Sequence, residues 1–127
     1  MSDAYAVQRF MDATKSFQTL EPALRERAGG VDGKKIDAVL IDLDAAIPGL
    51  DGEDLGRALV FKAYAVHWQY LTELGKKKSI FDVIGSDVDP RLVAALADAR
   101  KGEQLLETST DKTWAASTIQ QIEEYMR

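Results

Sequence analysis

The feature that most constrains the fold is a long stretch without helix breakers in the middle of the chain. Residues 53–74 contain no proline and a single glycine, Gly56. The apolar residues of this stretch are spread over more than one helical face, a pattern typical of a helix with neighbours on several sides. They are Leu55, Leu59, Val60, Phe61, Tyr64, Val66, Trp68, Tyr70, Leu71 and Leu74. We therefore predict a long central helix over about residues 52–74.

The residues before this stretch predict three further helices. Apolar residues recur at three- and four-residue spacing over residues 3–18, and Ser2 or Asp3 can cap that helix. Pro22 fits the first turn of a short second helix that ends at Gly29 and Gly30. A third helix is favoured over residues 33–47, although a strand remains an alternative there. Its apolar face consists of Ile36, Val39, Leu40, Leu43 and Ile47.

The residues after the central stretch predict one short helix and two longer ones. Ser79 and Asp82 indicate a one-turn helix that closes at Gly85. Asp89 and Pro90 then start a helix that ends at Lys101, before Gly102, with Leu92, Val93, Leu96 and Ala97 on its inward side. Asp111 is predicted to cap a last helix that continues to the C-terminus.

These patterns predict an all-α protein, a single bundle of five or six helices around the long central helix. No repeat, proline-rich linker or charge run divides the 127 residues, so we expect one domain over residues 1–127. Residues 108–127 follow a polar stretch and are expected to be either the last helix of the bundle or a C-terminal docking arm.

Composition narrows the classes of function. The net charge of −5 disfavours binding to phosphate backbones and anionic lipids, so we expect no sequence-specific nucleic-acid binding. The absence of cysteine suits a reducing compartment, and no apolar run approaches the roughly 20 residues that span a bilayer. We expect a cytoplasmic protein without a leader or membrane segment, and we interpret the basic runs at residues 34–35 and 76–78 as solvated helix ends.

One segment resembles a catalytic motif. The apolar run into Asp42, Leu43 and Asp44 is similar to the first motif of haloacid-dehalogenase-type phosphotransferases. That resemblance implies Asp42 as the nucleophile and Asp44 as the acid-base, both at the end of a strand. The chain departs from the family at Ala45 and Ala46, and the helical periodicity of residues 36–47 competes with the strand.

Other polar residues predict no catalytic, cofactor or metal site. The acidic residues at 51–54 and at 87 and 89 lack the ligand pattern of a calcium loop, and helix capping explains Asp51 and Asp89. His67 is the sole histidine, with no cysteine for it to activate, and is expected to be a hydrogen-bonded core or interface residue. We therefore predict a protein that is not an enzyme.

Aromatic and apolar side chains are the remaining candidates for function, because such residues are enriched in protein interfaces. Tyr64, Trp68 and Tyr70 lie on the central helix but cannot all point the same way. The residues predicted to bind a protein partner are Trp68, Trp114, Ile119, Ile122 and Met126.

Over about residues 32–107 the order of elements resembles the small helical head-to-tail connector (adaptor) proteins of tailed bacteriophages. The likeness is carried by the helix at residues 36–47, by Ala63, Tyr64, His67 and Tyr70, and then by Arg91, Ala95, Leu96, Gly102 and Leu105. It implies a homo-oligomeric ring beneath a portal, with the C-terminal segment on the portal or tail protein and DNA passing through. The location would then be the host cytoplasm and the virion.

The expected function is that of a non-enzymatic protein interaction or assembly module, with the connector ring as its most concrete form. Two alternatives stay open. One is a small regulatory or antitoxin-like protein that masks another protein, and the other is the phosphotransferase that uses Asp42 and Asp44.

Overall fold

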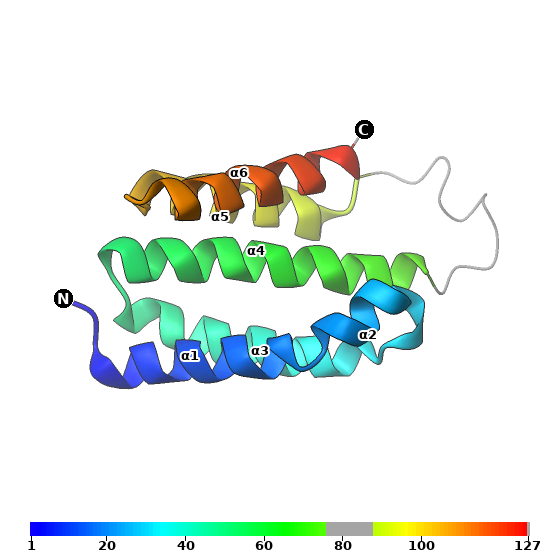
Figure 1. Ribbon diagram of the computed structural model, residues 1–127, viewed down its shortest axis with the longest axis horizontal. Coiled ribbons are helices and arrows are strands. Elements are labelled where there is room, and N and C mark those ends of the chain that lie inside the picture. Colours follow the sequence, from blue (N-terminus) through cyan, green and yellow to red (C-terminus); the bar gives the residue numbers. More distant parts are fainter. Residues whose placement is uncertain (76–87, 127) are drawn as a thin grey trace.

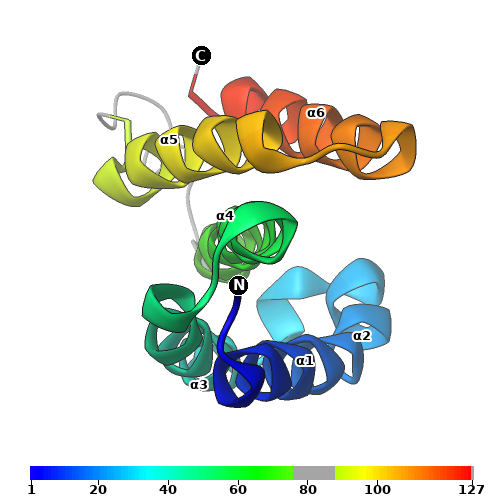
Figure 2. The same ribbon diagram turned by 90° about the vertical axis from the view of Figure 1, so that its left-hand side faces the viewer.

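The long central helix is the axis of the structure. In a computed structural model that describes residues 1–75 and 88–126, α4 spans Gly52–Leu74, 23 residues, as predicted. Gly52 has a φ of +54°, in the left-handed region that favours glycine, where the chain turns into α4. Helices α5 and α6 lie on one side of α4, and α1, α2 and α3 lie on the other (Figures 1 and 2). The described residues form six α-helices and no strand, which confirms the all-α prediction.

Three helices form the layer on the N-terminal side of α4. They are α1 (Ala4–Gln18), α2 (Glu21–Glu26) and α3 (Gly33–Ala46), with short 3-10 turns at Ala28–Gly30 and Ile47–Gly49. Asp3 and Asp32 cap α1 and α3 by accepting hydrogen bonds from Tyr5 N and Lys34 N. The core of this layer joins Phe17, Leu24, Ile36 and Leu43 to Phe61 of α4.

Helix α5 spans Pro90–Leu105, so the predicted end before Gly102 is wrong. Gly102 lies inside the helix because α4 and α5 cross there almost backbone to backbone. A Cβ atom on Gly102 would lie 2.6 Å from the carbonyl oxygen of Gly56. The predicted inward face is also wrong in part, since Val93 is 51% exposed and Ala97 is exposed. The buried face consists of Leu92, Ala95, Leu96, Ala99 and Gly102.

Helix α6 spans Ser109–Glu124 and begins earlier than predicted. The cap is Thr108, whose hydroxyl accepts a hydrogen bond from Asp111 N at 3.2 Å, and the Asp111 carboxylate pairs instead with Arg57 at 3.1 Å. The helix packs on α5 and α4 of its own chain through Ala115, Thr118 and Ile122. Residues 109–124 are therefore the last helix of the bundle, one of the two forms expected for them.

Some predictions fall outside the described residues. The one-turn helix at residues 79–85, the basic run at 76–78 and Asp87 belong to this group. None of the described helices combines the length and the apolar character that a membrane crossing requires.

Candidate functional site

The two carboxylates of the phosphotransferase-like segment do not form a common site. Both lie on α3, and Leu43 between them is fully buried. Residues two apart on a helix point in different directions. Asp42 accordingly pairs with Arg9 at 3.5 Å, while Asp44 pairs with Lys62 at 2.7 Å. The strand that the motif requires is absent, because this segment is helical.

The acidic residues near the helix starts pair with side chains or backbone groups of the same chain. Asp89 caps α5 and accepts from Arg91 N at 2.9 Å, as predicted. Asp51 occupies the cap position of α4, but its side chain makes no capping bond and instead accepts from Ser2 Oγ at 3.1 Å, so its predicted role is wrong. Glu53 and Asp54 pair with Arg57 at 3.6 and 3.5 Å. In residues 1–75 and 88–126, no three acidic, histidine or cysteine side chains cluster in a way that could hold a metal ion.

One side of α4, which we call the back seam, is closed by polar bridges to its neighbours. Lys62, Gln69 and Glu73 share one helical stripe because they are seven and four residues apart. Lys62 reaches Asp44 and Gln69 reaches Asp37, both on α3. Glu73 receives two hydrogen bonds from Arg91 at the start of α5, at 2.8 and 2.5 Å. The back seam thus links three helices.

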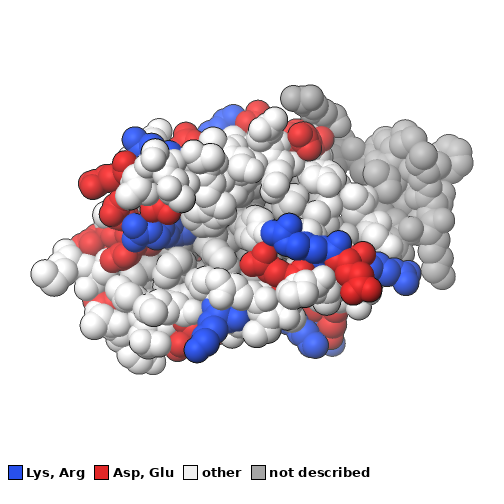
Figure 3. Space-filling model, in the orientation of Figure 1, with Lys and Arg blue, Asp and Glu red and all other residues white. Residues whose placement is uncertain are grey.

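The opposite side of α4 carries an open groove between α2 and α6, which we call the front groove (Figure 3). Figure 2 shows that α2 and α6, one from each layer, lie on the same side of α4. Its volume is about 720 Å³. None of the described hydrogen bonds or ion pairs joins α2 to α6 across it. The front groove is lined by Glu21, Arg25, Phe61, Tyr64, His67, Trp68, Leu71, Trp114, Ser117, Thr118, Gln121, Glu124 and Tyr125.

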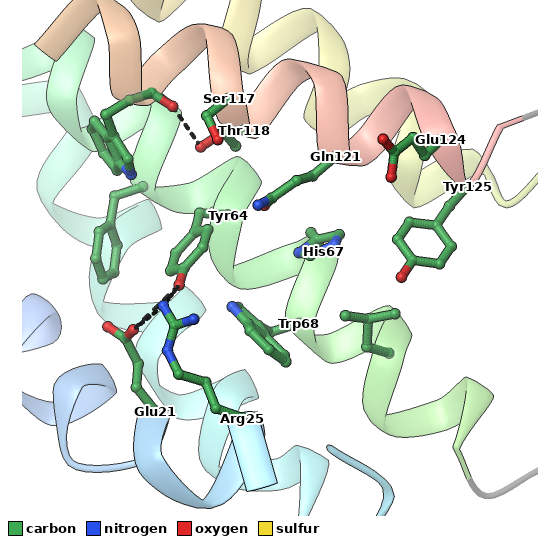
Figure 4. A pocket seen from close by; sticks show the side chains of 13 residues that line it. Glu21, Arg25, Tyr64, His67, Trp68, Ser117, Thr118, Gln121, Glu124 and Tyr125 are labelled. Carbon is green, nitrogen blue, oxygen red and sulfur yellow. Dashed lines mark hydrogen bonds and ion pairs between the residues drawn. The ribbon is translucent and has the colours of Figure 1, made fainter. Parts of the chain in front are cut away.

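The α2 edge of the front groove is held by a small polar network (Figure 4). The Arg25 guanidinium donates to the Tyr64 hydroxyl at 3.1 Å, and that hydroxyl donates to Glu21 at 3.2 Å. Arg25 also lies 6.0 Å from the centre of the Trp68 ring, within the range of a cation–π contact. Burial raises the pKa of Tyr64, which keeps its hydroxyl protonated as a donor.

Two buried polar atoms lie at the floor of the front groove without a hydrogen-bond partner among the described residues. They are Nδ1 of His67 and Nε1 of Trp68. The His67 side chain is only 5% exposed, and its ring centre lies 5.7 Å from that of Trp68 and 5.5 Å from that of Tyr125. Burial lowers the pKa of His67 to about 4, so the imidazole is neutral at pH 7. His67 is a core residue as predicted, but the predicted hydrogen bond is not made at Nδ1.

The residues predicted to bind a partner divide into two groups. Trp68 and Trp114 both line the front groove. Ile122 is fully buried between α4, α5 and α6, and Ile119 and Met126 pack against the same cluster, so these three face the chain's own core. Tyr64 was named as a candidate aromatic residue but not among the residues predicted to bind a partner, although the spacing of Phe61, Tyr64, Trp68 and Leu71 on α4 places all four on one stripe.

Comparison with models of protein families, with curated proteins and with solved structures found no match in any of the three. The resemblance to phage connector proteins therefore stays a prediction.

Proposed function

We propose that this chain is a non-enzymatic protein-binding module that receives a segment of a partner protein in the front groove. The observation that carries the proposal is the groove of about 720 Å³ over α4 between α2 and α6, with the half-buried Trp68 at its centre. Trp, Tyr and Arg are the residue types that dominate binding energy at interfaces, and Trp68, Tyr64 and Arg25 meet in this groove.

The shape of the front groove suits a helical segment. Its lining extends from Phe61 to Leu71 on α4 and from Trp114 to Glu124 on α6, followed by Tyr125 just beyond the helix. At 1.5 Å per residue, each wall is roughly 15 Å long, the length of about three helical turns. Grooves between two helices bind amphipathic helices through apolar side chains spaced three and four residues apart.

In its most concrete form the module is a ring subunit of a phage head-to-tail connector, with copies of itself and a portal or tail protein as partners. The resemblance over residues 32–107 favours this form, and the net charge of −5 suits a channel through which DNA slides. Light scattering on the purified chain tests it: a defined ring supports the connector, and a monomer at all concentrations contradicts it. A regulatory or antitoxin-like binding protein would use the same groove as a monomer.

The phosphotransferase alternative receives no support from the geometry, because Asp42 and Asp44 bind different basic residues on different helices. Phosphatase turnover that disappears in Asp42→Asn would revive it.

Two neighbouring glutamines provide a matched test of the front groove. Gln121 lines the groove and Gln120 does not, and both side chains are exposed, so either position tolerates a larger residue. The probe is a display library of random peptides of about 12 residues, roughly three helical turns. We expect peptides that bind the wild-type protein to be lost with Gln121→Trp and kept with Gln120→Trp. Equal binding to both variants would contradict the groove as the docking surface.

A further inference from the structure

The end of the front groove nearest the C-terminus of α6 has an unusual charge. The last turn of α6 contains Glu123 and Glu124 and no basic residue. The C-terminal end of a helix carries a partial negative charge and favours cations, so two carboxylates there are unfavourable unless a cation is supplied. Arg100 approaches Glu123 at 3.9 Å. Glu124, which lines the front groove, has no ion-pair partner among the described residues.

Aromatic rings surround the same end of the front groove. Figure 4 shows His67 next to Trp68 and Tyr125, the residue that follows α6, and Glu124 at the end of α6 lines the same groove. His67 is 5% exposed, with Nδ1 left without a partner among the described residues. The unprotonated nitrogen of a neutral imidazole accepts a hydrogen bond from a cationic donor, whereas an imidazolium ring would repel that donor. The faces of Trp and Tyr rings also attract cations.

The α2 edge of the front groove already shows this mode of binding inside the chain. Arg25 lies over the Trp68 ring and bonds to Tyr64 and Glu21. Among the described residues that line the groove, Arg25 is the one arginine or lysine, and it is occupied at this edge. At the other edge of the groove, Glu124 corresponds to Glu21, and His67 and Tyr125 provide the aromatic rings, but none of the described residues places a cation there.

From this arrangement we infer that the Glu124 end of the front groove takes a lysine or arginine side chain of the partner segment, paired with Glu124 and set against His67 and Tyr125. The inference rests on the proposed function and names the chemistry of its partner: an amphipathic helix with a basic residue near one end of its apolar stripe.

The peptide selection described above tests the inference through the composition of the retained peptides. We expect Lys and Arg to be enriched among peptides that are lost with Gln121→Trp. The enrichment should disappear with Glu124→Gln and persist with Glu123→Gln, a matched control because Glu123 does not line the groove. For one retained peptide, Glu124→Gln should weaken binding about tenfold, and that loss should vanish when the peptide's basic residue is changed to glutamine.

The two failures are distinguishable. Retained peptides that depend on Gln121 but show no excess of Lys or Arg would overturn the inference and leave the proposed function standing. A library with no peptide that depends on Gln121 would overturn the proposed function itself. An equal loss of binding with Glu123→Gln and Glu124→Gln would also overturn the inference, because it would indicate a general charge effect. Circular dichroism of each variant shows that the bundle is intact.

Discussion

The two sides of α4 differ in how their polar side chains are satisfied. At the back seam, charged and amide side chains of α4 reach both neighbouring helices and satisfy one another. At the front groove most of the α4 residues are aromatic, α2 and α6 stand apart, and two buried ring nitrogens have no partner among the described residues. Buried polar groups are nearly always hydrogen-bonded, so the polar groups of α4 are better satisfied at the back seam than at the front groove.

The largest expected effect is a pH dependence of the folding stability, which arises from His67 on the front-groove side of α4. His67 has a lowered pKa of about 4 in the folded chain against 6.5 in the unfolded chain, so protonation favours unfolding. Stability should be complete above pH 6.5, fall as the pH drops from 6.5 to 4, and change no further through this residue below pH 4. The total loss should be about 3 kcal/mol.

Urea unfolding of the wild type and of His67→Phe at several pH values measures this loss as the difference between the two proteins. Asp98 of α5 lies near Lys62 and Asp44 of the back seam, and burial raises its pKa. Its contribution to stability has the opposite pH dependence: it is present at low pH and is lost as the pH rises through the folded-state pKa. A difference between wild type and His67→Phe that is flat from pH 7 to pH 4 would contradict the buried neutral imidazole.

The next effect concerns the close crossing of α4 and α5 at Gly56 and Gly102. Gly102→Val would place side-chain atoms against the Gly56 carbonyl oxygen and against Val60, and push α5 away from α4. Overpacking of this kind costs about 2 kcal/mol or more. Thermal unfolding checks it, with Ala97→Val as the control, because Ala97 is exposed on the same helix. Equal melting temperatures for the two variants would show that the close crossing is not needed.

A smaller effect is expected from opening the back seam. Arg91→Met removes the bonds to Glu73 and Asp89, whose carboxylates raise the pKa of Arg91. Because the Arg91 side chain is 36% exposed, solvent screens these ion pairs and we expect a loss of about 1 kcal/mol that shrinks at high salt. Arg100→Met is the control, since its one described ion pair is long and exposed. A loss that does not depend on salt would point to packing instead.

The smallest effect compares one glutamine on each side. Gln69→Leu at the back seam removes the hydrogen bonds to Asp37 and to Arg91, although Arg91 keeps its bonds to Glu73 and Asp89, and should cost about 0.5 to 1 kcal/mol. Gln121→Leu in the front groove breaks no described bond and should change stability by less than about 0.5 kcal/mol. Chemical denaturation of both variants measures the difference. Equal costs would mean that the front groove is as closed as the back seam.

Much of the fold follows from local sequence signals. The bounds of α4, the caps at Asp3 and Asp89, and the inward direction of Leu43 were all predicted, because capping and apolar spacing act within a few residues. Asp51 and Asp111 show the limit of such signals. The Asp51 carboxylate accepts a hydrogen bond from Ser2, 49 residues away in the chain, and the Asp111 carboxylate pairs with Arg57, 54 residues away.

The candidate site was predictable only in part. Trp68 and Trp114 were identified by residue type, since large aromatic side chains are common in interfaces. Ile119, Ile122 and Met126 look equally suitable in the sequence, but the rotation of α6 turns them toward α4 and α5. Glu21 and Arg25 come from a helix of six residues whose position relative to α4 no local pattern encodes.

The sequence by itself determined where the helices run, because hydrogen bonding, capping and apolar periodicity are properties of short segments. Only the tertiary structure decided which faces of α4 are closed and which is left open. Gly102 is the clearest case. In the sequence a glycine at this position predicts the end of a helix, but in the structure its missing side chain allows the backbones of α4 and α5 to approach closely at Gly56, 46 residues away in the chain. The front groove exists because packing α5 and α6 on one side of α4, and α1 to α3 on the other, leaves α2 and α6 apart.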